Sequence, residues 1–212
     1  MNRIGDIKNF DRTTTRLVSY PRTGSHWLRM ILEQYLGKYC LPTSFYDSDE
    51  YWGFHLHDRE VGNGDEGITS DFKRVIYLYR NPVDVVYSQL IYEGWEFERR
   101  REIVEEYKIH LQRWRIDNND IDKIMFVKYE DIKTNPISAF FNIIEFLDEE
   151  WNEDKLIKIY NDSTLENLNK KIKYDDSVIN NNHFTGSYES ERLEFTETFG
   201  QEILKEFSGL WP

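Results

Sequence analysis

An arginine, a glycine and two hydroxyl residues are grouped in one short turn near the start of the chain, in the stretch Tyr20–Trp27. The turn follows an apolar segment and precedes an amphipathic one, so we expect it to join a strand to a helix. The first N–H groups of a helix have no partner inside the helix, and with the helix dipole they attract anions. Arg22 adds a fixed positive charge, and Gly24 lets an anion approach the backbone. Hydroxyl donors at Thr23 and Ser25 complete a candidate phosphate or sulfate site.

This turn is not a Walker A loop, because it has one glycine where that motif needs two, and it has no lysine. An ordinary capped helix that follows a strand explains the local sequence equally well. Taken by itself, the turn leaves both interpretations open.

A second candidate anion site lies in the stretch Tyr79–Ser88, where a buried strand is expected to end and a helix to begin at Pro82. Arg80 would lie at the carboxyl end of its strand, where sheets of this kind bind ligands. The hydroxyl of Ser88, further along the helix, can point to the same anion. The alternative is that Arg80 is a structural partner of Asp84. Two anion sites at neighbouring strand ends favour a nucleotide that carries two phosphorylated positions.

Composition limits the class of protein. The length of 212 residues predicts one domain over residues 1–212. The formal net charge of −12 argues against a nucleic-acid partner and against an anionic membrane surface. The single cysteine, Cys40, excludes an intramolecular disulfide and a thiolate metal cluster, which fits a reducing compartment. The N-terminal segment is polar and no apolar run is as long as a membrane span, so we expect a cytoplasmic protein.

Strand-like and helix-like segments alternate along the chain, which predicts an α/β fold of three layers: a central, mainly parallel sheet flanked by helices. Strands are expected at residues 16–20, 53–57, 74–79 and 124–128. Helices are expected at residues 25–36, 83–92, 96–114, 136–147, 154–159, 164–171 and 190–207. The two segments between them that are predicted as loops, residues 41–51 and 59–71, would frame a ligand crevice.

Together, the two candidate anion sites resemble the sulfotransferases that use 3′-phosphoadenosine 5′-phosphosulfate (PAPS). That family carries a loop like Tyr-Pro-Lys-Ser-Gly-Thr-Thr-Trp and a motif like Arg-Asn-Pro-x-Asp-Val-x-x-Ser, and the spacing from Arg80 to Ser88 is the family's. The segment Lys128–Asp131 is similar to its Tyr-Glu-Asp, and Ser163–Leu168 to its Ser-Phe-Glu-x-Met helix. The resemblance covers about residues 16–188 and implies a P-loop NTPase-like fold.

The resemblance also implies a role for each matching residue. Arg22 takes the place of the family's lysine and contacts the phosphosulfate near its bridging oxygen. Because arginine holds its proton far more tightly than lysine, we expect Arg22 to stabilise charge rather than to donate a proton. Arg80 and Ser88 hold the 3′-phosphate, and Tyr129 helps to enclose the base. Trp27 packs against the adenine or, as an alternative, is a core aromatic residue. The remaining loop donors are Thr23, Gly24, Ser25 and His26.

An acceptor hydroxyl needs a base, and a neutral imidazole can accept its proton near neutral pH. His55 and His57 share one face of an expected strand because side chains alternate along it. The family's catalytic histidine lies at the end of a strand in this interval, and His57, followed by Asp58, matches it best, with His55 as the alternative. A metal pair at these two histidines is a rival interpretation, but no histidine-rich cluster is evident and the family needs no metal.

The match to the family fails near the C-terminus, where the family has Arg-Lys-Gly followed by Gly-x-Trp. One register sets Gly186 and Tyr188 on the glycine and the tryptophan, which puts Asn181 and Asn182 at the basic pair. Another sets residues 184–186 on Arg-Lys-Gly and also lacks both cations. The sequence therefore predicts weakened nucleotide affinity, or a substitute cation at Lys170, Lys171 or Lys173.

These observations predict a sulfotransferase that moves a sulfuryl group from PAPS to a hydroxyl acceptor by in-line transfer and releases 3′-phosphoadenosine 5′-phosphate (PAP). The expected acceptor is a carbohydrate or a small alcohol or phenol. Aromatic residues that could line its pocket, or that simply pack in the core, are Phe45, Tyr46, Tyr51, Trp52, Tyr87, Tyr92 and Trp95. Two alternatives remain, a nucleotide kinase-like phosphotransferase and a non-catalytic PAP-binding protein.

Overall fold

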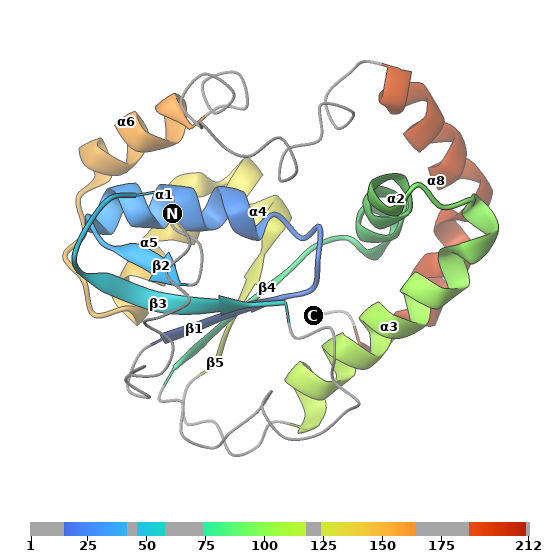
Figure 1. The fold of residues 1–212 in the computed structure, drawn as a ribbon, viewed down its shortest axis with the longest axis horizontal. Helices are drawn as coiled ribbons and strands as arrows, with labels where there is room; N and C mark the ends of the chain where they lie inside the picture. The colour runs from blue at the N-terminus through green and yellow to red at the C-terminus, as the bar shows by residue number, and fades with distance from the viewer. Residues whose placement is uncertain (1–14, 42–45, 58–73, 118–123, 164–186, 211–212) are drawn as a thin grey trace.

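A computed structural model of the chain describes residues 15–41, 46–57, 74–117, 124–163 and 187–210 and shows a three-layer α/β fold (Figure 1). Five parallel strands form one sheet in the order β2-β3-β1-β4-β5. The strands are β1 (Thr15–Ser19), β2 (Tyr39–Leu41), β3 (Tyr51–Leu56), β4 (Val75–Tyr79) and β5 (Ile124–Lys128). The helices are α1 (Ser25–Leu36), α2 (Pro82–Glu93), α3 (Arg100–Gln112), α4 (Tyr129–Thr134), α5 (Pro136–Phe146), α6 (Glu153–Asp162) and α8 (Ser187–Glu206).

Side chains alternate across the central strands, so each of these strands contributes to two hydrophobic clusters. Leu17 of β1 and Ile76 of β4 pack with α1, α5 and α6 on one face of the sheet. Val18 and Tyr77, one position further along each strand, pack with α2, α3 and α8 on the other face. Figure 1 shows these two groups of helices on opposite sides of the strands. β4 is apolar along its whole length, as expected of a strand that is buried on both faces.

The sheet order brings the two candidate anion sites to one edge. β1 lies between β3 and β4, with Leu17 paired to His55 and Ser19 paired to Leu78. After β1 the chain enters α1 on one face, and after β4 it enters α2 on the opposite face. Where connections diverge in this way, a crevice opens outside the carboxyl ends of the strands. The turn Tyr20–Gly24, Arg80 and His57 all follow these ends.

The predicted fold class is confirmed, and four predicted strands are found within two residues of their expected limits. Two elements were not predicted. β2 is only three residues long, shorter than the other strands of the sheet, and α4 begins directly where β5 ends. The helix expected at 96–114 is divided into a 3₁₀ turn (η2, Phe97–Arg99), α3 and a π-helical turn (η3, Arg113–Asp117). The helix expected at 164–171 lies outside the described residues.

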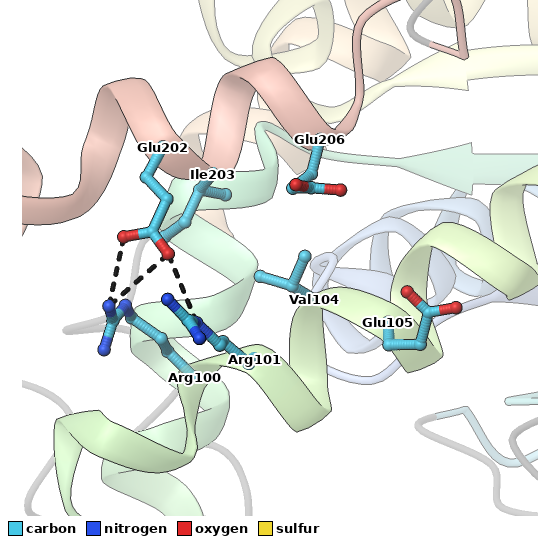
Figure 2. A pocket seen from close by; sticks show the side chains of 7 residues that line it. All are labelled: Arg100, Arg101, Val104, Glu105, Glu202, Ile203 and Glu206. Carbon is cyan, nitrogen blue, oxygen red and sulfur yellow. Dashed lines mark hydrogen bonds and ion pairs between the residues drawn. The ribbon is translucent and has the colours of Figure 1, made fainter.

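α3 and α8 lie side by side and are joined by ion pairs from Arg100 and Arg101 to Glu202. Figure 2 shows that these residues line a hollow between the two helices. None of the candidate site residues lines it. In the described part of the chain, no helix combines the length and the apolar character needed to cross a bilayer.

Candidate functional site

The turn after β1 has a backbone that only a few residue types adopt easily. Gly24, the N-cap of α1, has φ 96°, and Arg22 has φ 69° in the left-handed region. The buried hydroxyl of Thr23 donates to the carbonyl oxygen of Tyr20 at 2.8 Å, so it stabilises the turn itself. This differs from the expected ligand contact of that hydroxyl. α1 begins at Ser25, and the first N–H groups of a helix point out of its N-terminus, which is the arrangement that binds anions.

The ring of Tyr129, the first residue of α4, packs directly on Gly24. A Cβ atom added to Gly24 would overlap with Cε2 of Tyr129, closer than carbon atoms can approach. The guanidinium of Arg80 lies over the same ring, 4.7 Å from its centroid. Tyr129 therefore connects the two anion sites that the sequence predicts.

We expect Gly24→Ala to destabilise the fold more than Gly37→Ala. Both glycines have positive φ, but an alanine Cβ at position 37 would meet nothing within 4 Å. The control therefore carries the backbone strain of the left-handed conformation, while Gly24→Ala must also displace the Tyr129 ring, an overpacking cost of about 1–3 kcal/mol. Urea denaturation of both variants measures the difference. Equal losses of unfolding free energy would show that Tyr129 does not pack on Gly24.

Arg80 follows the last residue of β4 and is held on several sides. Its Nη1 donates to the carbonyl oxygen of Arg22 at 3.2 Å, and its Nη2 lies 3.6 Å from Oδ2 of Asp84. The predicted contact with Asp84 is thus present, but it does not use all the donors of the guanidinium. The Nε of Arg80 is buried and has no hydrogen-bond partner within the described residues. A buried donor without a partner is costly, so an anion bound here would satisfy it.

Ser88 of α2 contacts the turn after β1. Its Oγ accepts a hydrogen bond of 3.2 Å from Nε of Arg22. The guanidinium of Arg22 also lies over the ring of Tyr92, 4.8 Å from its centroid. The structure therefore brings together the cation of the first motif and the hydroxyl of the second, 66 positions apart in the sequence.

Trp27 lies on the first turn of α1 within a group of aromatic rings. Its centroid is 5.8 Å from that of Tyr129 and 5.4 Å from that of Tyr160. Its Nε1 donates to the carbonyl oxygen of Ser163 at 3.1 Å. The indole is half-buried, so it packs in the protein and still presents a surface beside the turn.

The two histidines predicted on one face lie together, with ring centroids 4.6 Å apart, but their surroundings differ. His55 is buried, with Nδ1 3.3 Å from Nη1 of Arg29 and Nε2 2.9 Å from Oγ of Ser19. A guanidinium can only donate, so Nδ1 of His55 accepts and Nε2 carries the proton. Burial, together with the charge of Arg29, lowers the pKa of His55 well below its usual value. His55 is therefore a neutral structural group.

His57 follows β3 and is half-buried. Its Nδ1 lies 3.1 Å from the carbonyl oxygen of Ser19. A carbonyl oxygen can only accept, so Nδ1 of His57 donates and carries the proton of the neutral ring. The lone pair is then on Nε2, and a histidine held in this way is oriented to accept a proton.

The remaining predicted residues are placed as follows. Ser25 is buried, and the side chain of His26 is exposed on the first turn of α1. Gly186 lies outside the described residues. Of the aromatic residues considered for an acceptor pocket, Trp52 and Tyr87 are buried and belong to the two hydrophobic clusters.

Some residues at this edge of the sheet were missed by sequence reasoning. Tyr107 and His110 of α3 hold the backbones of Arg80 and His57. Arg192 of α8 pairs with Oδ1 of Asp84 at 2.8 Å, so a second arginine reaches the carboxylate that Arg80 contacts. A sequence signal for Tyr107 and His110 was available, because they are polar residues on the otherwise apolar side of α3 and buried polar groups need partners.

Comparison with known proteins identifies the family. The sequence model described as the Sulfotransferase domain matches residues 54–197, which include His57, the Arg80–Ser88 segment and Tyr129. Amine sulfotransferase of Oryctolagus cuniculus is 22% identical, covering 72% of this chain and 62% of that protein. Cytosolic sulfotransferase 13 of Arabidopsis thaliana is 26% identical, covering 73% of this chain and 61% of that protein. The chain thus spans about three fifths of the length of these relatives.

Solved structures share the fold. The mouse sulfotransferase SULT7A1, complexed with PAP, has a TM-score of 0.57 at 18% identity, covering 97% of this chain and 92% of that one. The sulfotransferase domain of the Synechococcus PCC 7002 olefin synthase has a TM-score of 0.53 at 16% identity, covering 89% and 94%. The sheet and its flanking helices are therefore those of the P-loop NTPase-like sulfotransferase fold. Because the domain model matches most of the chain, the chain belongs to the sulfotransferase family.

Proposed function

We propose that this protein is a PAPS-dependent sulfotransferase that acts on a hydroxyl acceptor, with His57 as the base. The observation that carries the proposal is that three adjacent strands end in the turn with Arg22, in Arg80, and in His57. The first two place two arginines beside one another, since Arg80 donates to the Arg22 carbonyl oxygen, and Arg22 in turn donates to Ser88. A cofactor with an anionic group at each end fits such a pair.

The described residues fit a nucleotide of this kind. The buried Nε of Arg80 has no partner in the described part of the chain, and Arg80 and Ser88 both contact Arg22, so we assign the 3′-phosphate to Arg80 and Ser88. The start of α1, with Arg22, Gly24 and Ser25, takes the 5′-phosphosulfate. Trp27 and Tyr129 are assigned to the adenine base because their rings face the same turn. Bound PAPS supplies an activated sulfuryl group.

We assign different parts of the sulfuryl transfer to His57, to Arg22 and to the start of α1. His57 accepts the proton of the acceptor hydroxyl at Nε2 while Nδ1 keeps its hydrogen bond to Ser19. With PAPS bound, the transfer would form the bond between the acceptor oxygen and sulfur and break the bond between sulfur and the phosphate oxygen, and the imidazole of His57 would hold the proton that the acceptor loses. Arg22 and the start of α1 stabilise the negative charge that develops on the departing oxygen. Arg22 acts as a fixed charge because a guanidinium does not give up its proton at neutral pH.

For the acceptor we propose a carbohydrate or a small alcohol or phenol. The supporting contact is that of Tyr92, an exposed aromatic residue whose ring lies against the guanidinium of Arg22. An aromatic face beside the sulfuryl site suits the flat faces of phenols and sugars. One of the named relatives is an amine sulfotransferase, so an amine belongs in the test panel as a comparison.

Two measurements on the wild-type protein test the proposal. Calorimetric titration with PAP is expected to show binding, and incubation with PAPS and a panel of phenols, sugars and amines is expected to give a sulfated hydroxyl product by mass spectrometry. Failure to bind PAP would overturn the proposal. Binding of PAP without transfer to any acceptor would favour a non-catalytic PAP-binding protein. Binding of ATP that depends on Mg²⁺, in place of PAP, would favour a kinase-like phosphotransferase.

A further inference from the structure

One face of α3 is attached to the ends of three neighbouring strands. The hydroxyl of Tyr107 accepts from the backbone N–H of Arg80 at 3.2 Å and donates to the Arg80 carbonyl oxygen at 3.0 Å. Nε2 of His110 donates to the carbonyl oxygen of His57 at 3.0 Å. The hydroxyl of Tyr20 donates to Glu106, which is also on α3, at 2.9 Å. The residues after β4, β1 and β3 are thus all bonded to the same helix.

The hydrogen bonds of His110 have a fixed direction. The His57 carbonyl oxygen can only accept, so the proton of the neutral His110 ring is on Nε2. Nδ1 then accepts from the hydroxyl of Tyr77 on β4, at 2.7 Å. Both side chains are buried, and burial lowers the pKa of His110 to about 3, so the ring stays neutral around pH 7. The chain Tyr77–His110–His57 therefore has a single arrangement of donors.

The side chains around these bonds are closely packed. Tyr107 and His110 are three positions apart and lie on the same side of α3. The ring of Tyr20 packs against both, with centroids 4.8 Å from Tyr107 and 5.6 Å from His110. Tyr20 and Tyr107 are almost fully buried, so little room is left for either backbone contact to shift.

We propose that Tyr107 and His110 are positioning residues, which hold the backbones of Arg80 and His57 on one rigid helix and so set the base at a constant place relative to the bound nucleotide. The proposal rests on the function proposed above. It explains why two polar side chains, Tyr107 and His110, occupy the buried side of α3. In-line transfer depends on such placement, because a displacement of about 1 Å can lower a rate by about 10²-fold.

The two residues are expected to differ in what their loss changes. His110→Leu removes the donor to His57 and is expected to lower kcat by about 10–100-fold, with PAP affinity within about twofold of wild type. His110→Gln retains an amide N–H near the position of Nε2 and is expected to recover most of kcat. Tyr107→Phe keeps the ring but loses both bonds to Arg80, so we expect about fivefold weaker PAP binding by calorimetry. The control is Ile109→Ala on the same helix, at a side chain that is 47% exposed, which should change neither quantity.

Equal kcat values for His110→Leu and His110→Gln would overturn the proposal, as would a loss of PAP affinity in His110→Leu as large as its loss of kcat. A readout that needs no activity is ¹⁵N NMR of the histidine rings, in which wild type should show His110 neutral and protonated on Nε2. His110→Leu, if it keeps its fold by circular dichroism, should then shift or broaden the His57 ring signals, and unchanged signals would refute the positioning role. If wild-type protein binds PAP but transfers no sulfate, the proposed function fails, and the NMR result still decides whether His110 positions His57.

Discussion

Replacing His57 with alanine is expected to lower kcat for sulfuryl transfer by about 10²–10⁴-fold, the usual contribution of a positioned general base. PAP affinity is expected to stay close to that of wild type, because the ring is bonded to Ser19 rather than to either arginine of the proposed nucleotide site. Steady-state kinetics with a phenol or sugar acceptor and calorimetry with PAP measure the two quantities separately.

The matched variant for this prediction is His57→Asn. An asparagine amide can replace the Nδ1 donor to the Ser19 carbonyl oxygen, but it cannot accept the acceptor's proton at neutral pH. We therefore expect His57→Asn to be as inactive as His57→Ala. If the asparagine variant instead kept near-wild-type turnover, the histidine would act through its hydrogen bond to Ser19 and not as a base.

Replacing Arg80 with alanine is expected to weaken PAP binding by about 10–100-fold. The loss corresponds to about 1.5–3 kcal/mol for one hydrogen-bonded charged group. The substitution removes the buried Nε that has no partner in the described residues, and it removes the cation that lies over Tyr129. Calorimetric titration with PAP at fixed ionic strength measures the change.

Arg101→Ala provides the control for charge. Arg101 is 79% exposed and lines the hollow between α3 and α8, where it pairs with Glu202 (Figure 2). The same loss of one positive charge at that place should leave PAP affinity unchanged. Similar affinities for Arg80→Ala and wild type would contradict the assignment of the 3′-phosphate to Arg80. Arg80→Lys should give an intermediate affinity, because it keeps the charge but loses the planar fork of donors.

Much of the fold could be predicted because its signals are local. The helix at Ser25–Leu36 was predicted with its observed limits, since an apolar periodicity begins after Gly24 and ends before Gly37. β2 was missed because three residues are too few to show an alternating pattern, and its existence depends on pairing with β3. α4 was missed because its six residues continue directly from β5 with no turn signal between them.

The candidate site was predicted less completely than the fold. The sequence pointed to Arg22, Arg80, Ser88 and Tyr129, because each belongs to a motif of adjacent residues at the end of a strand. Which of two histidines can act as a base was left open there. The surroundings of the two histidines differ because the guanidinium of Arg29 occupies Nδ1 of His55, and nothing in the local sequence indicates that contact.

The sequence by itself determined the strand–turn–helix corners, the cations and hydroxyls they carry, and the family to which they belong. These features depend on residues that are close to one another in the sequence, because backbone preferences act over a few consecutive residues. Only the tertiary structure decided that Arg22 meets Ser88, that Tyr129 closes on Gly24, and that α3 holds the strand ends. The contact of His110 with His57 joins residues 53 positions apart, and its protonation state follows from burial against Tyr77. Such contacts arise only when the packed layers bring distant side chains together and exclude water from them.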